Sequence, residues 1–561
     1  MKSIYISFCL LVLTESTMAQ KVIFLTGDEE YRSEESMPMI ARILERDYGF
    51  TTKVGFSLDE DGTVNPRAVE SMTGTGELSD ADLMVLFLRF RSPSDEVFQN
   101  ILDYIDSGKP VVGFRTATHA FRFPWETDKA NSWNYRGAPI EEHPERYADY
   151  GPDRTRELLG QSWITHHGSF KEHKGKLTDV TPVENSANPI LNGIKPFSVH
   201  SWLYHVHGGG YSLSGDPEWL LNGTALKSQK IEKNETHIFP LTNPVAWARE
   251  KNDTSGRLFF TTLGHPFDFR EEGMRRLAIQ GILWALGEEN LIPKEGVDTK
   301  TVGPYDPNDA GVRDSHKAGL KPEDFLKPEP RKISKSQADW YEKYKDQENI
   351  PNPDAMLLNR DPEPDLEEGF TNLYNGKDLT GWNLKGGECL FEAKGEKIIG
   401  KTVVGTGSTY LCSDKPYRDF VFSAEIMWVV DMNTGIMFRS QVRNDEKGRE
   451  IVFGPQAEME GHERGRGWSG GVYGQSCGGY WYPLWLDQHE EVRNALKPGE
   501  WNRITIKAKG DTVKTWVNGI PAAHWLNDDY LEGFIGLQVH AGKKGEVEFR
   551  NIKVKPFISE K

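Results

Sequence analysis

Cysteine is scarce in this sequence. The 561 residues include four cysteines, at positions 9, 389, 412 and 477, and residues 20–290 contain none. So few cysteines exclude a small scaffold that is held together by several disulfides. The same absence excludes a cysteine thiolate as the nucleophile of any reaction carried out by residues 20–290.

Positive charge is in the minority. Lys and Arg number 67 against 84 Asp and Glu, which gives a formal net charge of −17. An acidic chain repels phosphate backbones, and we therefore expect no nucleic acid among the partners. Hydrophobic residues make up 37% of the chain, which is enough material for folded cores.

No hydrophobic run approaches the length of a membrane span. The run at residues 4–13 is too short, because a helix across a membrane needs about 20 apolar residues. Lys2 precedes this run, and Thr17-Met18-Ala19 follows with the small-x-Ala pattern of a cleavage site. We therefore expect a cleaved signal peptide at residues 1–19, no membrane span, and a secreted or periplasmic protein.

From residue 20 onward, strand patterns alternate with helix patterns. Apolar strands are expected at 22–25, 52–56, 83–88, 111–114 and 257–263, and amphipathic helices at 37–48, 95–105 and 274–286. Such alternation predicts an α/β domain with a doubly wound parallel sheet over residues 20–290.

The character of the sequence changes twice after residue 290. Residues 291–368 hold 10 of the 31 prolines, many charges and one short helical candidate near 337–344, and we interpret them as a linker. Residues 369–561 show short apolar runs between turn signals, which is typical of an all-β sandwich. The expected strands are 420–428, 435–439, 451–458, 501–507, 512–517, 535–539 and 546–554.

The strand at 111–114 leads into a polar segment that ends at His119. Open α/β sheets bind ligands beyond the carboxyl ends of their strands, so His119 is a candidate site residue. A histidine that satisfies a loop carbonyl would show the same spacing, and both interpretations stay open.

Ten of the 15 histidines fall between His119 and His265. His205 and His207 would face one way on a strand, a spacing that is compatible with a metal ion. The motif has no clear carboxylate ligand, and the histidines would equally suit a polar sugar pocket. The sequence thus requires no cofactor, and a divalent metal at His205 and His207 stays one hypothesis.

Four pieces of the first domain resemble the ThuA-like (trehalose-utilisation) family. They are FLTGD at 24–28, GFRTATH at 113–119, PVAW at 244–247 and GRLFFTTLGH at 256–265. The resemblance covers nearly all of residues 21–287 and implies a class I glutamine amidotransferase-like fold. Amidotransferases of that class use a cysteine that is missing here, so glutamine hydrolysis is not expected. The resemblance implies substrate-binding roles for Asp28, His119 and His265.

Gln456, Glu458 and Glu460 alternate along one expected strand and would share a face of it. Arg439 lies on a neighbouring candidate strand. Carboxylates beside an arginine can bind sugar hydroxyls or act as acid and base, although a solvated strand face would alternate in the same way.

A glycine-rich aromatic run follows at residues 468–482. Flat rings with polar rims suit the apolar faces of sugars, and we select Trp468, Tyr473 and Trp481 as candidates for substrate binding. The alternative is that these rings pack onto the sandwich.

The second domain, from residue 369 onward, resembles the 3-keto-disaccharide hydrolase family. The resembling pieces are FTNLYNGKDLTGW at 370–382, NTGIMFR at 433–439, GEWN at 499–502, VNG at 517–519, GLQVH at 536–540 and EFRNI at 548–552. The resemblance implies a concanavalin A-like jelly-roll sandwich and cleavage of 3-keto glycosides.

A 3-keto group acidifies the neighbouring C2 proton, so one base can remove this proton while the C1 substituent leaves, and water then adds to the enone. The route needs a base, a cationic stabiliser for the enolate oxygen and a proton donor for the leaving group. We assign these roles to Glu458, Arg439 and His540, with Gln456 and Glu460 binding the sugar.

These observations predict an exported, two-domain carbohydrate-processing enzyme that acts on 3-keto glycosides. No GxGxxG motif follows the first strand, so a separate sugar 3-oxidoreductase upstream would make the keto group. Two alternatives stay open. One is a noncatalytic protein with two carbohydrate-binding modules, and the other is a conventional sandwich-fold glycosidase, whose two carboxylates residues 458–463 match only loosely.

Overall fold

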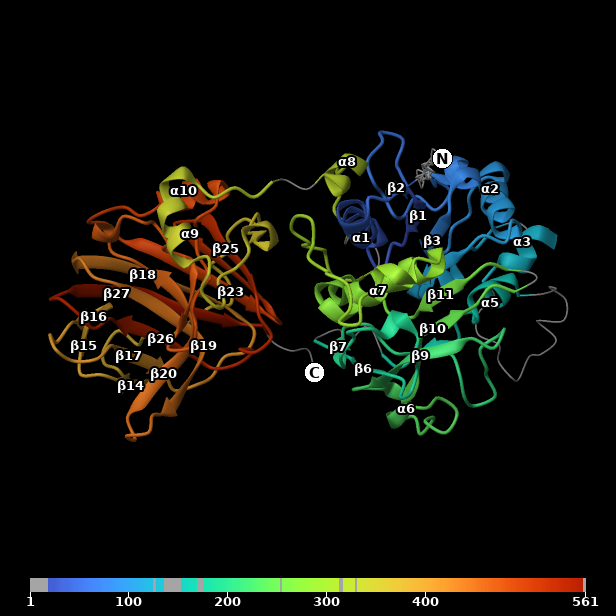
Figure 1. The fold of residues 1–561 in the computed structure, drawn as a ribbon. Coiled ribbons are helices and arrows are strands. Elements are labelled where there is room, and N and C mark those ends of the chain that lie inside the picture. The colour runs from blue at the N-terminus through green and yellow to red at the C-terminus, as the bar shows by residue number, and fades with distance from the viewer. Residues whose placement is uncertain are drawn as a thin grey trace, which may run out of the picture. The chain divides into compact units, whose positions relative to one another are not determined.

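The computed structural model describes residues 19–124, 128–135, 153–168, 175–252, 255–311, 316–327 and 330–557. They form two compact units (Figure 1), and each unit is built from two stretches of the chain. The first unit takes Met1–Val302 and Pro307–Lys327, and the second takes Gly303–Asp306 and Pro328–Lys561. The expected signal peptide lies outside the described residues, apart from Ala19.

A nine-stranded sheet forms the centre of the first unit, in the strand order β2-β1-β3-β4-β11-β10-β9-β6-β7. Its strands are β1 (Lys21–Gly27), β2 (Thr51–Gly55), β3 (Leu83–Leu88), β4 (Val111–Phe114), β6 (Thr178–Pro182), β7 (Phe197–Val199), β9 (Glu218–Ala225), β10 (Thr242–Arg249) and β11 (Leu258–Thr261). The short strands β5 (Thr165–His166) and β8 (Tyr204–His205) form a separate antiparallel pair.

This sheet is parallel in one half only. The strands from β2 to β11 pair in parallel, whereas β11, β10, β9, β6 and β7 pair antiparallel. A parallel pair needs a crossover of about a dozen residues or more, and only residues 250–257 join β10 to β11. The α/β class is confirmed, and the all-parallel sheet is corrected to a mixed one.

Helices cover both faces of the sheet. Phe98 and Ile101 of α2 (Asp95–Asp106) pack against Ile23 and Met84 on one face. The helix α7 (Glu272–Leu286) lies on the opposite face, where Gly281 approaches the ring of Phe259, and α1 (Ser33–Tyr48) packs beside α7. The shorter helices are α3 (Asp128–Trp133), α5 (Arg154–Leu159), α6 (Gln229–Glu232) and α8 (Pro322–Leu326).

The second unit contains two antiparallel sheets. One has the order β12-β25-β24-β23-β18-β27-β16-β15, with β13 beside β27, and the other has the order β14-β17-β26-β19-β20-β21-β22. The strands of the first sheet are β12 (Leu357–Leu358), β13 (Thr371–Asn372), β15 (Leu390–Lys394), β16 (Lys397–Lys401), β18 (Phe420–Val430), β23 (Asn502–Lys509), β24 (Thr512–Val517), β25 (Ile520–Leu526) and β27 (Glu546–Pro556). Those of the second are β14 (Trp382–Gly386), β17 (Thr409–Ser413), β19 (Thr434–Asn444), β20 (Glu450–Met459), β21 (Val472–Gln475), β22 (Gly479–Tyr482) and β26 (Phe534–Val539).

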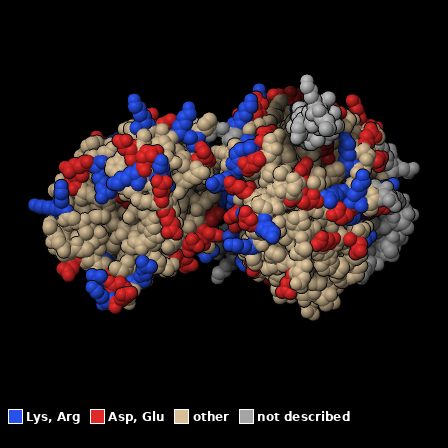
Figure 2. Space-filling view, viewed as in Figure 1, with Lys and Arg blue, Asp and Glu red and all other residues tan. Residues whose placement is uncertain are grey.

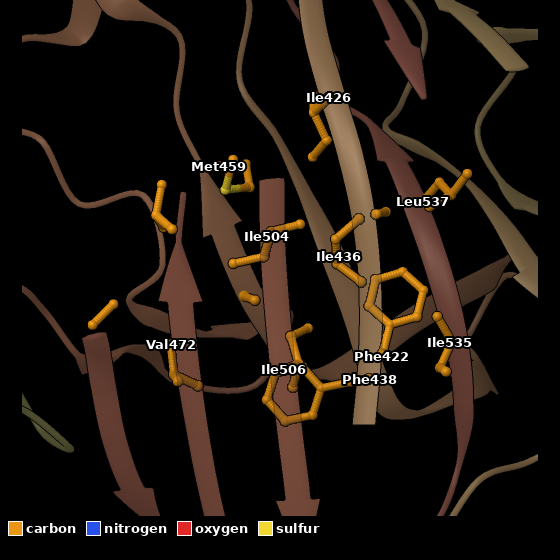
Figure 3. Packing of buried hydrophobic residues seen from close by; sticks show 14 of the residues in the cluster. Phe422, Ile426, Ile436, Phe438, Met459, Val472, Ile504, Ile506, Ile535 and Leu537 are labelled. Carbon is orange, nitrogen blue, oxygen red and sulfur yellow. The ribbon is translucent and has the colours of Figure 1, made fainter. Parts of the chain in front are cut away.

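The apolar faces of these two sheets form one core (Figure 3). Ile426 and Ile504 come from one sheet, Ile436 and Leu537 come from the other, and all four are completely buried. Burial of each such side chain contributes about 1.5–3 kcal/mol to stability. Apolar residues at alternate positions of each strand supply these buried side chains, so the alternation in the sequence stabilises the packing of the two sheets. The expected all-β character of this part of the chain is confirmed.

The segment 291–368, which we expected to be a linker, contributes to both units. In the first unit, Arg275 donates from Nε to the carbonyl of Thr299 over 2.8 Å. In the second unit, Met356 belongs to the core and β12 pairs with β25. The helices α9 (Ala338–Tyr344) and α10 (Glu490–Arg493) also belong to the second unit.

Acidic and basic side chains are interspersed over the surface that Figure 2 shows. Among the helices that the structure describes, none combines the length and the apolar character that crossing a membrane requires.

Candidate active site

The strand β20 presents a polar face away from the core of the second unit. Ala457 and Met459 belong to the core, so Gln456 and Glu458 point to the opposite face of the sheet. Glu460 follows the strand directly. These three polar side chains are nevertheless buried, and Glu458 keeps only 7% of its surface exposed. The loop after β20 contacts Glu460 through Trp468 and Ser469.

Glu458 lies in a network of hydrogen-bond donors. Asn433 donates from Nδ2 to Oε1 over 2.6 Å, and Gln456 donates from Nε2 to Oε2 over 3.1 Å. The guanidinium of Arg466 lies close to the same carboxylate, with Nη2 at 3.8 Å from Oε1. The carboxylate is thus fixed in orientation, with a cation beside it.

The environment of Glu458 raises its pKa to about 7. Burial is the largest cause and the negative charge of Glu460 is the second, while Asn433 and Arg466 act in the opposite direction. A buried carboxyl group whose pKa lies near neutral pH suits general acid–base catalysis.

Gln456 connects Glu458 with the next strands of the sheet. Its Nε2 also donates to Oε1 of Gln538 over 3.1 Å, and Gln538 donates to the hydroxyl of Tyr410 over 3.3 Å. The amide can cross β19 because residue 435 is glycine: a Cβ atom there would lie 2.1 Å from Nε2 of Gln456. Oε1 of Gln456 is buried and has no hydrogen-bond partner in the described part of the protein, so it can accept a hydrogen bond from a ligand.

Arg466 joins the second carboxylate to an aromatic wall. Its Nε donates to Oε1 of Glu460 over 2.5 Å, and its Nη1 donates to the hydroxyl of Tyr480 over 2.8 Å. The guanidinium carbon lies 4.2 Å from the ring centroid of Trp468 and 4.9 Å from that of Tyr480. Ion pair and cation–π contacts together hold this cation beside Glu458 and Glu460.

The structure separates the three aromatic candidates. The half-buried Tyr473 lies opposite Gln456 in the β20–β21 ladder, and its ring centroid is 5.2 Å from that of Tyr480. Trp468 is fully buried, and its ring packs against the guanidinium of Arg466. Trp481 stacks on Trp525 at 5.2 Å, and the structure does not bring it to Glu458.

Arg439 is not beside Glu458 either. The register of β19 shifts between Met437 and Gln441, and Arg439 sits in this bulge with a φ of 47°. Its guanidinium donates to the carbonyls of Arg418 and Gly510 and to the carboxylate of Asp419. These contacts tie strand ends together, and Arg466 is the arginine that lies beside Glu458.

His540 follows the end of β26, two residues after Gln538. Its Nδ1 contacts the carbonyl oxygen of Ala541. Burial is the largest cause that lowers the pKa of His540, and the charge of Arg464 also lowers it. Within the described residues, no observed contact joins His540 to Glu458.

A second cluster lies at the carboxyl edge of the sheet in the first unit. Asp28, just after β1, is completely buried, and its Oδ1 accepts hydrogen bonds from the backbone N–H groups of Glu30 and Tyr31 at 2.8 Å and 3.0 Å. Its Oδ2 accepts a hydrogen bond from the hydroxyl of Thr116, just after β4. All its observed contacts organise the loops of the site, and its role in substrate binding stays a prediction.

His119 lies in a group of aromatic rings. Its centroid is 5.2 Å from that of Phe90, 5.4 Å from Tyr135 and 5.7 Å from Trp163. Burial and neighbouring arginines hold the pKa of His119 well below its usual range, so the imidazole is neutral. Nε1 of Trp163 and Nδ1 of His166 are buried, and neither has a partner within the residues that the structure describes.

Charged side chains surround this aromatic group. Arg89 pairs with Glu29 and with Glu30, and its guanidinium carbon lies 4.3 Å from the ring centroid of Phe90. Burial is the largest cause that raises the pKa values of both carboxyl groups. Arg115 is completely buried and donates to the hydroxyl of Tyr31 over 3.0 Å.

His265 caps the 3-10 helix η4 (Pro266–Arg270), where its Nδ1 accepts a hydrogen bond from the N–H of Phe267 at 3.1 Å. Its ring stacks against His200, with centroids 5.4 Å apart. The observed contacts of His265 therefore support the fold of this loop, and the structure does not place it against His119.

His205 and His207 have separate surroundings. His205 is fully buried, and its Nε2 lies 3.2 Å from the carbonyl oxygen of Gly208. The ring of His207 packs against Trp219 at 4.6 Å. Within the described ranges, no group of three His, Cys, Asp or Glu side chains could hold a metal ion.

Sequence reasoning missed several groups of the second unit's site, including Asn433, Gln538, Tyr410, Arg466 and Tyr480. Asn433, just before β19, and Gln538, within β26, lie in motifs that the analysis singled out, so their polar side chains were available as a signal. Arg466 lies in a loop. Its position beside Glu458 and Glu460 depends on how this loop folds back onto the sheet, and sequence periodicity does not predict the path of a loop.

The two folds and their polar clusters define the class of protein: an α/β unit joined to a β-sandwich that carries buried carboxylates and an arginine on one sheet face. Residues 21–285 match the family described as Trehalose utilisation (ThuA). Residues 369–555 match the family described as 3-keto-alpha-glucoside-1,2-lyase-like domain. The predicted fusion, in this order, is confirmed, and these matches indicate a carbohydrate-active protein.

Solved structures resemble the two units separately. A "putative glycosyl hydrolase" from Parabacteroides distasonis is 20% identical, with 35% of this chain and 100% of that chain covered and a TM-score of 0.25. The carbohydrate binding module CBM66 from Bacillus subtilis is 17% identical, with 31% and 96% covered and a TM-score of 0.20. A "putative thua-like protein" from Parabacteroides merdae is 16% identical, with 48% and 90% covered and a TM-score of 0.30. None of the curated proteins matches this chain.

Proposed function

We propose that the second unit cleaves 3-keto glycosides by removal of the C2 proton, elimination at C1 and hydration, and that the protein is exported. The observation that carries this proposal is the buried carboxyl of Glu458, whose pKa is raised to about 7 next to the fixed cation of Arg466. The match of residues 369–555 to the 3-keto-alpha-glucoside-1,2-lyase-like family supports the substrate class.

Glu458 acts as the base. It takes the C2 proton, the electron pair of the C–H bond forms the enolate of the 3-keto group, and the C1–O bond then breaks to leave a C1=C2 enone. The leaving group takes a proton as it departs. Water then adds its oxygen to C1 and a proton to C2, so the sum of the steps is hydrolysis.

Arg466 takes the role that the sequence suggested for Arg439. A guanidinium next to the base can stabilise the negative charge that develops on the enolate oxygen. Gln456, whose Oε1 has no partner among the described residues, binds a sugar hydroxyl. His540 stays the candidate proton donor for the leaving group. Its lowered pKa reduces the fraction of the imidazole that is protonated at neutral pH.

The first unit binds a related sugar at the carboxyl edge of its sheet. The support is the aromatic group around His119, in which Nε1 of Trp163 and Nδ1 of His166 are buried and have no partner among the described residues. Aromatic faces and neutral N–H donors suit a polyhydroxylated ring. We assign this unit to the class I glutamine amidotransferase-like fold and the second unit to the concanavalin A-like jelly rolls.

The mechanism needs no cofactor, because a carbonyl that is already present in the substrate makes the C2 proton acidic. A separate sugar 3-oxidoreductase supplies that carbonyl. Treatment with a chelator should therefore leave kcat unchanged, and loss of activity that one divalent ion restores would contradict this part of the proposal.

The test is turnover of 3-keto-trehalose and 3-keto-lactose in D₂O beside the unoxidised sugars. We expect cleavage of only the keto forms, with deuterium at C2 of the product. Glu458→Gln, which keeps shape but cannot take a proton, should slow turnover by about 10²–10⁴-fold. Cleavage of the unoxidised sugars would indicate a conventional glycosidase, and binding without any turnover would indicate the noncatalytic alternative.

A further inference from the structure

The helix α9 (Ala338–Tyr344) precedes the part of the chain that matches the lyase-like family, which begins at residue 369. Nevertheless it packs on the site of the second unit. Gln337, just before the helix, accepts a hydrogen bond from Nε1 of Trp468 at 2.6 Å and donates to the carbonyl of Arg466 over 3.0 Å. The helix is thus anchored to the two residues that lie beneath and beside the carboxylates.

The residues around α9 also contact Trp485. The N–H of Ser334 donates to the carbonyl of Trp485 over 2.9 Å, and the ring of Tyr341 meets that of Trp485 edge-on at 5.2 Å. Trp485 is completely buried in the core. These contacts fix α9 in place, so that its remaining aromatic residues keep a defined position at the site.

Two aromatic residues of α9, four positions apart, extend the aromatic wall of the site. The rings of Trp340 and Tyr344 are nearly parallel, at an angle of 3° and a centroid distance of 6.3 Å. Tyr344 meets Tyr480 at 5.0 Å, and Tyr480 meets Tyr473 at 5.2 Å. A continuous series of rings therefore runs from the face of β21 beside Gln456 to the outer surface of α9.

These rings retain access to solvent. Trp340, Tyr344, Tyr473 and Tyr480 are all only partly buried, unlike Trp468. The ammonium of Lys343 lies 5.6 Å from the ring centroid of Trp340 and 5.1 Å from that of Tyr344. An N–H donor thus stands beside partly exposed ring faces, which is the combination that binds a sugar: apolar ring faces with a polar rim.

We propose that Trp340 and Tyr344 form a second sugar subsite, which binds the leaving-group ring of a 3-keto disaccharide while Glu458 acts on the oxidised ring. This inference rests on the proposed function of the second unit. Its consequence is specificity: the chain prefers substrates whose leaving group is itself a sugar over those with a small alkyl leaving group. Trp340 and Tyr344 are then specificity-determining residues that the family-matched region does not contain.

The test compares two substrates in the full chain. A 3-keto disaccharide carries the second ring, whereas methyl 3-keto-glucoside carries only the oxidised ring. We expect Trp340→Ala and Tyr344→Ala to lower kcat/KM for the disaccharide by about tenfold each and to leave kcat/KM for the methyl glycoside within about twofold. Tyr344→Phe keeps the ring and should keep most of the preference.

Glu342→Gln is the matched control, because Glu342 is exposed on the same helix and pairs only with Lys345 among its observed contacts. This variant should leave kcat/KM unchanged for both substrates. An equal loss for both substrates, or no loss for the disaccharide, would overturn the subsite.

Failure of the proposed function is recognised separately. If the wild-type chain cleaves neither substrate, calorimetric binding of the unoxidised disaccharide to the same variants decides the matter. Tenfold weaker disaccharide binding in Trp340→Ala, with no change for methyl glucoside, supports the subsite without the reaction. Unchanged or undetectable disaccharide binding overturns it.

Discussion

Glu458 and Glu460 share the guanidinium of Arg466, which lies 3.8 Å from Oε1 of Glu458 and donates from Nε to Oε1 of Glu460 over 2.5 Å. Two buried carboxylates therefore meet around one cation. The closer pair with Glu460 leaves Glu458 incompletely neutralised, and the negative charge of Glu460 raises the pKa of Glu458. This arrangement keeps one carboxyl able to accept a proton near neutral pH.

The pH dependence of activity should follow this pair. The base must be ionised, so kcat/KM should rise as the pH increases through about 7 and then level off. Glu460→Gln removes the like charge and leaves Arg466 free to act on Glu458 alone. Both changes favour the ionised form, so the acid limb should move to lower pH, as pH–rate profiles of the two proteins would show.

The control for this shift is Glu463→Gln, which removes the same charge from an exposed position in the neighbouring loop. It should leave the acid limb where it is, because solvent screens exposed charges. An acid limb that stays fixed or moves to higher pH in Glu460→Gln would contradict the assignment of Glu458 as the base.

Glu458 should also reduce stability at high pH. Its folded-state pKa of about 7 lies above the ordinary value of 4.5. Below about pH 4.5 the group is protonated in both states and has no effect. As the pH rises toward 7 the unfolded chain releases its proton first, so the free energy of unfolding falls. Glu458→Gln does not titrate, and its Tm relative to the wild type should be higher at pH 8 than at pH 5.

The size of this difference corresponds to about 1–3 kcal/mol. Thermal melts of both proteins at the two pH values measure it. If the difference in Tm between the proteins were the same at pH 5 and pH 8, the carboxyl would not be held in its protonated form by the fold.

Arg439 should matter for stability and hardly at all for catalysis. Its guanidinium donates to three carbonyls and to the carboxylate of Asp419, and Arg439→Met would remove all of these hydrogen bonds. We expect a loss of about 2–4 kcal/mol in the free energy of unfolding. At a temperature at which the variant is still folded, kcat should stay within about threefold of the wild type.

Chemical denaturation and turnover at low temperature separate the two effects. A large fall in kcat of the folded Arg439→Met protein would return this residue to the role of enolate stabiliser. Arg439→Lys keeps the charge and part of the hydrogen bonding, and should lie between the wild type and the methionine variant in stability.

Much of the fold was predictable because local patterns and tertiary structure agree. The expected strand 83–88 coincides with β3, and the expected helix 95–105 with α2, whose cap Ser94 accepts a hydrogen bond from the N–H of Val97. The helix expected at 37–48 begins at Ser33 instead. Its N-cap Arg32 makes no side-chain capping bond, so Glu34 and Glu35 in the first turn are the signals that mark this start.

Only those residues of the site that follow the regular alternation of a strand were predictable. The period of two places Gln456 and Glu458 on one face, as the structure shows. The same period would bring Arg439 to that face, but one extra residue in β19 changes the alternation between Met437 and Gln441. Nothing in the sequence marks an arginine for a positive φ such as that of Arg439, and contacts such as that of Gln337 with Trp468 join residues 131 positions apart.

Gly435 is the last test of the network, because its missing side chain makes room for another residue. A Cβ atom at this position would lie 2.1 Å from Nε2 of Gln456, so Gly435→Ala must push the amide away from both Glu458 and Gln538. The obstacle is the flexible end of a side chain, so the cost in stability should be small, about 1–2 kcal/mol. Turnover should fall by about tenfold, because Gln456 holds Glu458 and binds the sugar.

A double-mutant cycle checks the cause of this loss. If Gly435→Ala acts through Gln456, it should add almost nothing to the loss in kcat/KM that Gln456→Ala already produces, since the displaced group is then missing. Fully additive losses in the double variant would mean that Gly435 serves the backbone of β19 instead. The comparison therefore decides whether Gly435→Ala lowers turnover by displacing the amide of Gln456 or by disturbing the backbone of β19.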